Sequence, residues 1–506
     1  MTAAPVDAPR MAFSAPESMR HGTLICAAVA CLLCGCAVGP DFVRPAPPTE
    51  QRYTSEAQID KTLTADGQAQ RFGVDIPLAA DWWKLFKSEQ LDAMVRRAIV
   101  DNPTLQAADA SLRESQDNLR AGYGVFFPRV DATADGSRNR SAPISEGLQT
   151  PGSIYNLVTV SGSIGYTLDV FGGDRRMVES LQAQTDYQRN AGNAAYLALT
   201  ANVVNTCIAR AAYASQIRAT VQLIAMETEQ LAAIQAQVNV GTSPYSSVLS
   251  MRSLIAANQA TLAPLRQKLD QSEHLLATLE GIPSSGASLP DIALSSLALP
   301  ADLPLSLPSD LVRQRPDILQ AEALLHVASA NIGVATAAMF PSFSLTGTYG
   351  AAGTGLGNLS MPAGRFWSIG PSVSIPLFHG GSLWYTRKAA IDAYQVTEAN
   401  YRQAVLTAFA QVADCLKALE HDAEALQAQT EAQRAAKDAL HLLNVNYDTG
   451  MVAYVDVLAA DVQYRQATIL YLQAVAQREQ DTVALFAALG GGWWNAKSQA
   501  PAGKSP

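Results

Sequence analysis

The sequence has few charged and few aromatic residues for its length. Of 506 residues, 16% are charged and 7% are aromatic, and the formal net charge is −9. This negative balance leaves no overall basic surface for a nucleic-acid backbone, so we expect no nucleic-acid partner. Apolar residues make up 48% and the mean hydropathy is +0.04, which excludes a disordered polyampholyte and a bundle of membrane-spanning helices.

The sequence has few cysteines and histidines, and their spacing does not fit a disulfide framework, a metal site or a catalytic site. Four of the six cysteines crowd the N-terminus, and only Cys207 and Cys415 follow, which is no disulfide framework. The pair Cys31 and Cys34 lacks a second pair that would complete a metal site. The histidines are isolated, and no nucleophile motif accompanies them. We therefore predict no metal, no cofactor, no catalytic residue and no enzyme activity.

An export signal is encoded near the N-terminus. The chain has a basic start after Met19, followed by an apolar run from Leu24 to Leu33 that is too short to span a bilayer. We interpret residues 1–35 as a leader and signal peptide, with Met19 as the translation start.

The signal ends in a lipid-attachment motif. Leu33-Cys34-Gly35-Cys36 looks like a bacterial lipobox, which implies cleavage before Cys36 and lipidation of that cysteine. Residues 36–80 are then a lipidated N-terminal tether. The alternative is a plain cleaved signal with an incidental cysteine.

The chain contains two copies of one unit. Two prolines stand 25 positions apart in each copy, Pro103 with Pro128 and Pro316 with Pro341, without a gap. Further matches are LDVFGG with PLFHGG, and the pattern Gly-x-x-x-Tyr-x-x-Val-Leu, which occurs twice. The predicted domains are repeat 1 at 81–281, a proline-rich connector at 282–309, repeat 2 at 310–490 and a C-terminal tail at 491–506. The prolines of the connector continue neither a helix nor a central strand.

Each copy is expected to hold one long helical hairpin. The segments 173–241 and 383–450 lack proline, are rich in Ala, Leu, Gln and Glu, and carry apolar residues at helical spacing. At 1.5 Å per residue each helix would be about 100 Å long. Each ends at a glycine suited to a left-handed C-cap, and a second helix returns at 245–280 and 453–489.

Before each long helix the hydrophobic period changes to two, which predicts a β-hairpin in each copy. Apolar and polar residues alternate over 158–170 and 367–377, and the expected partner strands are 130–136 and 343–349. Aromatic residues at the strand ends resemble the girdles of a membrane barrel: Phe126, Phe127, Phe171, Phe340 and Phe378 at one end, with Tyr155, Phe366 and Trp367 at the other. The alternative is an amphipathic sheet lying on a soluble core.

Four strands in a membrane would need partners. The smallest membrane barrels have about eight strands, and lipid tolerates no open sheet edge. Three chains would supply twelve strands and a water-filled lumen, although the sequence alone does not establish the number of subunits. The polar faces predict these lumen-facing residues: Thr159, Ser161, Ser163, Thr167, Asp169, Ser368, Ser372 and Ser374.

Several motifs spread over residues 36–494 resemble the TolC-like outer-membrane factors, in their lipoprotein branch of NodT and OprM type. They include CAVGPDFVRP, DWWKLFKSEQLDAMV, RQRPDILQAEALL, GPSVSIPLF and ALGGGWW. The resemblance implies an α+β fold and a homotrimer with a shared twelve-stranded β-barrel and an α-helical periplasmic barrel. It also implies an exit duct in the cell outer membrane, lipid-anchored and membrane-spanning, that works with a periplasmic adaptor and an inner-membrane pump.

The resemblance also implies a gate at the periplasmic tip. Tyr447 matches the family's linking tyrosine and Asp456 an acidic position of the inner helix, where symmetry-related carboxylates would favour cations. The sequence departs from the family pattern at Val452, Ala459 and Ser247. Asp461 could supply a substitute for the ring acid missing at Ala459, but two residues turn a helix by about 200°, so Asp461 would point away from the side on which Ala459 lies.

Three other functions compete with this interpretation. A periplasmic adaptor lipoprotein would have one hairpin and soluble sheet domains. A lipid-tethered coiled-coil spacer would conduct nothing, and a secreted hydrolase has only the export signal in its favour.

Overall fold

A computed structural model describes residues 37–56, 59–74, 76–142, 147 and 151–495. They form two compact units, one drawn from described residues within 37–43, 116–184 and 325–397 and the other from described residues within 44–115, 185–324 and 398–495. Each unit contains parts of both repeats. The predicted signal peptide and Cys36 lie outside the described residues.

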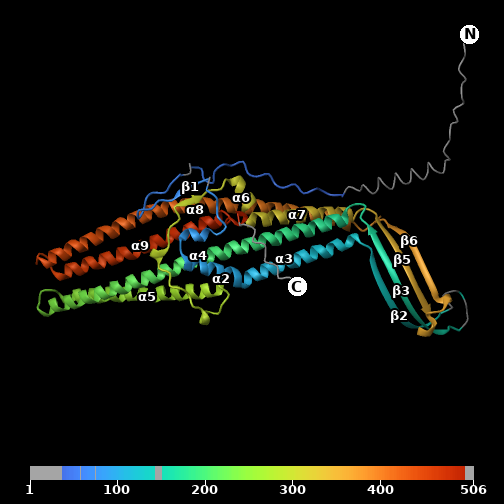
Figure 1. The fold of residues 1–506 in the computed structure, drawn as a ribbon, viewed down its shortest axis with the longest axis horizontal. Helices are drawn as coiled ribbons and strands as arrows, with labels where there is room; N and C mark the ends of the chain where they lie inside the picture. The colour runs from blue at the N-terminus through green and yellow to red at the C-terminus, as the bar shows by residue number, and fades with distance from the viewer. Residues whose placement is uncertain (1–36, 57–58, 75, 143–146, 148–150, 496–506) are drawn as a thin grey trace, which may run out of the picture. The chain divides into compact units, whose positions relative to one another are not determined.

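The first unit contains a four-stranded antiparallel sheet. Its strands are β2 (Arg129–Arg140), β3 (Ile154–Leu168), β5 (Ser342–Gly353) and β6 (Arg365–Ser374), side by side in the order β2-β3-β5-β6 (Figure 1). Each repeat supplies one hairpin, as the alternating pattern predicted, and the strand ends lie within four residues of the predicted ones. Such strands of ten to fifteen residues are long enough to cross a bilayer at a tilt.

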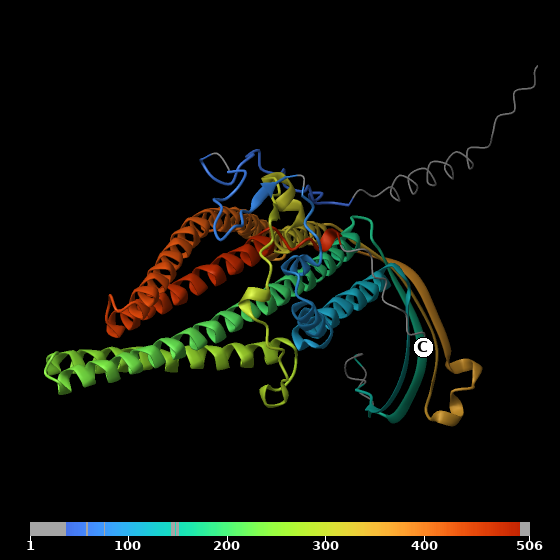
Figure 2. The same cartoon turned by 60° about the vertical axis from the view of Figure 1, so that its left-hand side comes forward.

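Helical hairpins, one from each repeat, make up most of the second unit. The helices are α4 (Gly173–Asn239) with α5 (Tyr245–Leu279), and α8 (Ser382–Asp448) with α9 (Tyr454–Ala488). In each pair the second helix returns alongside the first (Figure 2). This confirms the predicted hairpins to within two residues at each end.

The two hairpins turn in the same way. Gly241 and Gly450 have φ of 80° and 74°, in the left-handed region where a side chain would be strained. The N–H of Gly241 bonds to Val238 O at 3.0 Å, and the next N–H, of Thr242, bonds to Gln237 O at 2.9 Å. The Gly450 turn repeats this pair of bonds, which satisfies the last carbonyls of the long helix.

Each repeat begins with two shorter helices that are separated at a proline. They are α2 (Glu89–Asp101) and α3 (Pro103–Gly122) in the first repeat, and α6 (Pro308–Gln314) and α7 (Pro316–Ala337) in the second. Asn102 and Arg315, which precede the prolines, are extended, because a following proline disfavours helical backbone.

The connector has more structure than its prolines predicted. Its residues Asp302–Pro304 form a strand, β4, that pairs in parallel with β1 (Arg71–Gly73). Helix α6 also begins inside the connector, at Pro308, because proline is compatible with the first turn of a helix. Neither element conflicts with the expectation that the prolines continue neither a helix nor a central strand, because β4 is an edge strand and α6 begins at its proline. A two-stranded ribbon exposes an edge, which a proline tolerates.

The core of the second unit lies where the N-terminal segment meets the hairpins. Trp82 in the short 3-10 helix η1 (Trp82–Phe86) stacks on Phe486 of α9, with ring centroids 5.2 Å apart. Phe86, Leu91 and Leu485 are also buried here. Residues far apart in the sequence thus fix the base of both hairpins. Among the described residues, α7 alone is long and apolar enough by composition to cross a membrane, and half of that stretch is buried.

Candidate functional site

The polar residues of the sheet lie on one face. Residues paired directly across antiparallel strands point to the same side. One row across the four strands consists of Asp131, Ser163, Thr348 and Ser368. The remaining predicted lumen residues within β3 and β6 alternate in phase with Ser163 and Ser368 and share this face: Thr159, Ser161, Thr167, Ser372 and Ser374. The structure therefore groups them on one surface, while their exposure to a lumen stays a prediction.

The opposite face is apolar and bare. Its neighbouring row reads Val130, Ile164, Gly347 and Ile369, and the side chains of Val130 and Ile369 are 72% and 70% exposed. Exposed apolar residues continue along this face: Val160, Leu168, Leu345 and Val373. A soluble protein rarely exposes so much apolar surface. Among the described residues of this unit, the sheet therefore has the face expected of a membrane strand set and lacks the covering core of the soluble alternative.

Asp169 differs from the other predicted lumen residues. It follows the last residue of β3, and its carboxylate accepts hydrogen bonds from the backbone N–H groups of Asp174 and Arg175 at 3.1 and 2.9 Å. It also pairs with the guanidinium of Arg175 at 3.1 Å. A carboxylate at a helix N-terminus satisfies free N–H groups and complements the helix dipole. Asp169 thus secures the start of α4, a contact that strand periodicity could not reveal.

The aromatic girdle predicted at the loop end of the sheet was wrong in part. Tyr155 pairs with Asn139 and Phe366 with Gly350, so both aromatic rings belong to the polar face. The ring of Phe366 also explains Gly350, because a Cβ there would lie 2.6 Å from it. Only Trp367 of the predicted three lies on the apolar face, where it pairs with Tyr349. The sequence predicted that these aromatic residues lie near the strand ends, but it did not predict on which face of the sheet each ring lies.

Tyr447 and Asp456, the predicted gate residues, lie on either side of the α8–α9 turn. The ring of Tyr447 contacts that of Tyr454, with centroids 5.3 Å apart. The Tyr454 hydroxyl donates a hydrogen bond to Glu229 of α4, and this bond is the main cause that raises the pKa of Tyr454. The Asp456 carboxylate accepts from the backbone N–H of Ala453 at 3.1 Å and so caps α9. Sequence reasoning missed Tyr454 and Glu229, because nothing in the local pattern pairs α9 with α4.

The positions that depart from the family pattern carry no replacement charge. Val452 and Ser247 are half-buried and Ala459 is exposed. Asp461 is buried, and its carboxylate lies 3.3 Å from Nε of Arg465 one turn further on. The helical angle predicted that Asp461 would point away from the side on which Ala459 lies, and Ala459 is exposed whereas Asp461 is buried.

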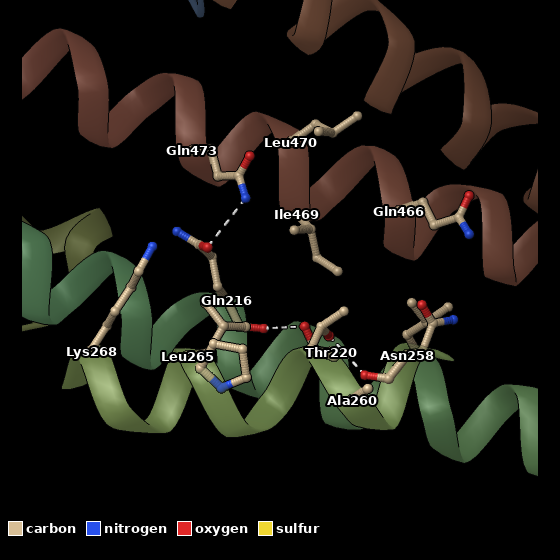
Figure 3. Close-up of a pocket in the computed structure, with 13 residues that line it drawn as sticks. Gln216, Thr220, Asn258, Ala260, Leu265, Lys268, Gln466, Ile469, Leu470 and Gln473 are labelled. Atoms are coloured by element: carbon tan, nitrogen blue, oxygen red, sulfur yellow. Dashed lines mark hydrogen bonds between the residues drawn. The ribbon is translucent and has the colours of Figure 1, made fainter. Parts of the chain in front are cut away.

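Further polar contacts join α9 to α4. Nη1 of Arg465 donates to Oε1 of Gln222 at 2.6 Å, and Nε2 of Gln473 donates to Oε1 of Gln216 at 3.3 Å. Beside the second contact is a pocket of about 680 Å³ between α4, α5 and α9 (Figure 3). Its lining mixes amide and aliphatic side chains with one lysine, Lys268. Polar bonds thus join the two hairpins of one chain here, in addition to the apolar core that they share.

Charged groups are buried between α8, α9 and the N-terminal segment. Arg478 is 1% exposed, and its guanidinium donates to Oε1 of Gln70 at 3.0 Å and to Oγ1 of Thr62 at 3.1 Å. Burial, together with the nearby carboxyl group of Asp481, raises the pKa of Asp422 to about 8. Burial also raises the pKa of Glu479 to about 8. In both cases burial disfavours the charged carboxylate.

The chain segment after Cys36 is fixed to the sheet-bearing unit. The N–H of Val38 bonds to Phe171 O at 3.0 Å, and the buried Arg176 donates to Oδ1 of Asp41 at 2.6 Å. The ring of Phe42 stacks on His326, with centroids 4.2 Å apart. The tether therefore leaves this unit from a defined place.

The last feature is the pair of cysteines outside the N-terminal segment, together with possible metal ligands. Cys207 and Cys415 are both free thiols, the first buried and the second half-buried. The described residues contain no group of three or more His, Cys, Asp or Glu side chains arranged to hold a metal ion.

Comparison with known proteins decides between the alternatives. The family model described as "Outer membrane efflux protein" matches residues 94–281 and 307–491, which correspond to the two repeats. The chain belongs to the outer membrane efflux protein family. Its α+β fold is that of the TolC-like outer-membrane factors, as the motifs predicted. It is an outer-membrane channel of an efflux system, not an adaptor and not an enzyme.

Relatives match this efflux protein over most of its length. The solvent efflux pump outer membrane protein SrpC of Pseudomonas putida is 30% identical over 91% of this chain and 96% of its own. The cation efflux system protein CusC of Escherichia coli K12 is 27% identical over 92% and 98%. The outer-membrane channel OprN has a TM-score of 0.80 at 24% identity, over 90% and 100%. The open state of the MtrE channel of Neisseria gonorrhoeae has a TM-score of 0.77 at 26% identity, over 90% and 99%.

Proposed function

We propose that three copies of this efflux protein close one twelve-stranded barrel and form a passive exit duct with a periplasmic adaptor and an inner-membrane pump. One observation carries the proposal: the end strands β2 and β6 of the sheet are not joined to each other, while the apolar face is bare. Unpaired backbone groups in lipid cost several kcal/mol each, by the approximate scale of transfer energies. Sister chains must therefore complete the ring, since about eight strands are the minimum.

A matched pair of substitutions tests the barrel. Ile369 and Ser368 are neighbours on β6 that face opposite sides of the sheet. Ile369→Asp places a charge toward lipid, and we expect loss of heat-modifiable trimers and of conductance in planar bilayers. Ser368→Asp places the same charge toward water, and the trimers and the conductance should persist. Equal tolerance of both changes would refute the barrel, and a wild-type trimer without conductance would favour a spacer.

The duct itself makes little choice of cargo in this proposal. The polar face offers mostly hydroxyl groups, and one of its few carboxylates, Asp131, pairs with Arg129 at 2.7 Å. A wide water-filled lumen lined in this way discriminates weakly between solutes, so the pump selects what is exported.

The gate of the proposed duct lies at the α8–α9 turn. Asp456 is exposed at the start of α9, where three copies around one axis would bring three carboxylates together. Tyr447 supports Tyr454 through ring contact, and Tyr454 ties this turn to α4. In this proposal the link replaces the linking arginine that some family members carry at the position of Val452.

Lipid attachment at Cys36 completes the proposal. The segment from Val38 to Phe42 is bound to the unit that carries the sheet, so a lipid on Cys36 would be held near the membrane strands. Labelling with a radioactive fatty acid tests this point. Incorporation into the wild type and not into Cys36→Ser is expected, and equal labelling would refute it.

A further inference from the structure

Three arginines lie on the apolar face of the sheet, at the end that carries the strand-to-strand loops. Arg138 and Arg140 alternate in phase with Val130 of β2, so they share its side of the sheet. Arg365, the first residue of β6, alternates in phase with Ile369 and pairs with Ala351. All three side chains are exposed. Charge on this face is unexpected, because the other residues of the face are apolar except for Asn156, which pairs with Arg138.

Along the apolar face of β6, the residue types change in the order expected on crossing a lipid leaflet from its interior outward. Val373 and Ile369 come first, Trp367 with its partner Tyr349 follows, and Arg365 comes last. Aromatic side chains gather at the boundary between hydrocarbon and headgroups. Two residues further on, at about 3.3 Å per residue, an arginine reaches the headgroup layer.

None of the three arginines has a protein partner among the described residues. The ion pairs of this unit involve other arginines, such as Arg129 with Asp131 on the polar face. An unpaired guanidinium on a lipid-facing surface is costly unless an anion compensates it. Phosphate suits the guanidinium, which presents parallel N–H groups to two oxygens.

Closure of the ring would bring the arginines together. In the proposed trimer, on which this inference rests, β6 of one copy lies beside β2 of the next. Arg365 begins β6 and Arg140 ends β2, and both lie at the loop end of the sheet. We propose that Arg365 of one copy and Arg138 and Arg140 of the next form, at each seam, a site for the phosphate groups of outer-leaflet lipids. Each site is incomplete within a single chain.

Binding of lipid with and without phosphate tests the site. Purified trimer in detergent is titrated with a bis-phosphorylated glycolipid of the outer leaflet and with the same lipid after dephosphorylation, and retained lipid is counted by native mass spectrometry. We expect at least tenfold tighter retention of the phosphorylated form. Equal retention of the two would overturn the proposal, since acyl-chain contact alone would then explain binding. Inorganic phosphate should not displace the lipid, and displacement would mean that a free anion is the ligand.

Charge-matched variants locate the site. Arg138→Gln, Arg140→Gln and Arg365→Gln together should abolish the preference for phosphate. The control combines Arg252→Gln, Arg266→Gln and Arg313→Gln, three exposed arginines of the other unit, and should keep it. A preference kept by the first variant, or lost equally in both, would overturn the site. Native gels separate the two proposals: a wild-type trimer without the phosphate preference refutes only this inference, whereas a wild-type chain that never trimerises refutes the proposed function and removes the seam.

Discussion

The hydroxyl group of Tyr454, the first residue of α9, donates a hydrogen bond to Glu229 near the end of α4. These residues belong to different repeats and are 225 positions apart. Tyr454 follows the second hairpin's turn directly, and Glu229 lies about three turns of helix before the end of α4. A rearrangement that separates the second hairpin from the first must therefore break it, together with the Arg465–Gln222 contact further along.

Removal of this hydroxyl should favour the open duct. A hydrogen bond of this kind contributes about 1 kcal/mol, so Tyr454→Phe should raise the open population about fivefold. The measurement is single-channel conductance and open probability in planar bilayers. Tyr471→Phe is the matched control, because its hydroxyl bonds to Asp66 at 2.6 Å, away from the turn. An open probability unchanged in Tyr454→Phe, or raised equally in both variants, would rule out the link as a lock.

The charge of Asp456 should set the ion preference of the tip. Asp456→Asn keeps an oxygen that can accept from Ala453 N–H and removes only the charge. We expect reduced preference for cations with conductance of similar size, read from the reversal potential in a salt gradient. Asp448→Asn, at the last residue of α8, is the control for a charge lost from the same turn. A reversal potential that shifts only in the control would place the selective carboxylate at Asp448.

Sequence periodicity was enough to predict both hairpin types, because each relies on contacts repeated along a continuous stretch. The strands around Ser163 and Ser368 and the helices that end near Gly241 and Gly450 were all predicted on this basis. Contacts that depend on a distant partner were not predictable. Tyr454–Glu229 is one example.

The wrong or incomplete predictions concern the face of the sheet on which a residue lies and the distant residues that it contacts. Phe366 and Trp367 are adjacent aromatics, and their assignment to opposite faces requires the strand register. Asp169 continues the alternation of β3, yet the helix that follows determines its contacts. The strand Asp302–Pro304 exists because Arg71–Gly73 lies beside it, which no local pattern announces.

Stability should fall as the pH rises toward 9, because of the buried carboxyl groups. An acid whose pKa is raised to about 8 in the folded protein, as for Asp422, binds its proton more tightly folded than unfolded. The penalty is absent at low pH, grows above the ordinary pKa near 4, and is complete above pH 8. Glu479 adds to this slope with the same sign. The thermal midpoint of the detergent-solubilised protein should therefore decline from pH 5 to pH 9.

Asp422→Asn isolates one part of this slope. An amide donates to Asp481 without a titrating proton, so the midpoint of the variant should depend less on pH. Asp438→Asn changes an exposed carboxylate of the same helix and should keep the wild-type slope. Identical slopes in the two variants would show that Asp422 is already ionised in the folded protein at neutral pH.

Cysteine labelling should distinguish the two faces of the barrel wall residue by residue. Ser372 and Val373 are adjacent on β6, the first on the polar face and the second on the apolar face. In membranes, Ser372→Cys should react with a charged, membrane-impermeant thiol reagent, and a bulky adduct there should reduce conductance. Val373→Cys should stay unlabelled because lipid covers it.

The two native thiols among the described residues give little background in this experiment. Burial raises the pKa of Cys207 to about 12 and that of Cys415 to about 11, so the reactive thiolate is rare at neutral pH. The wild type is the control for labelling, and the same reagent applied after denaturation shows that each new thiol is present. Labelling of Val373→Cys in preference to Ser372→Cys would reverse the assignment of the faces, and with it the water-filled side of the barrel.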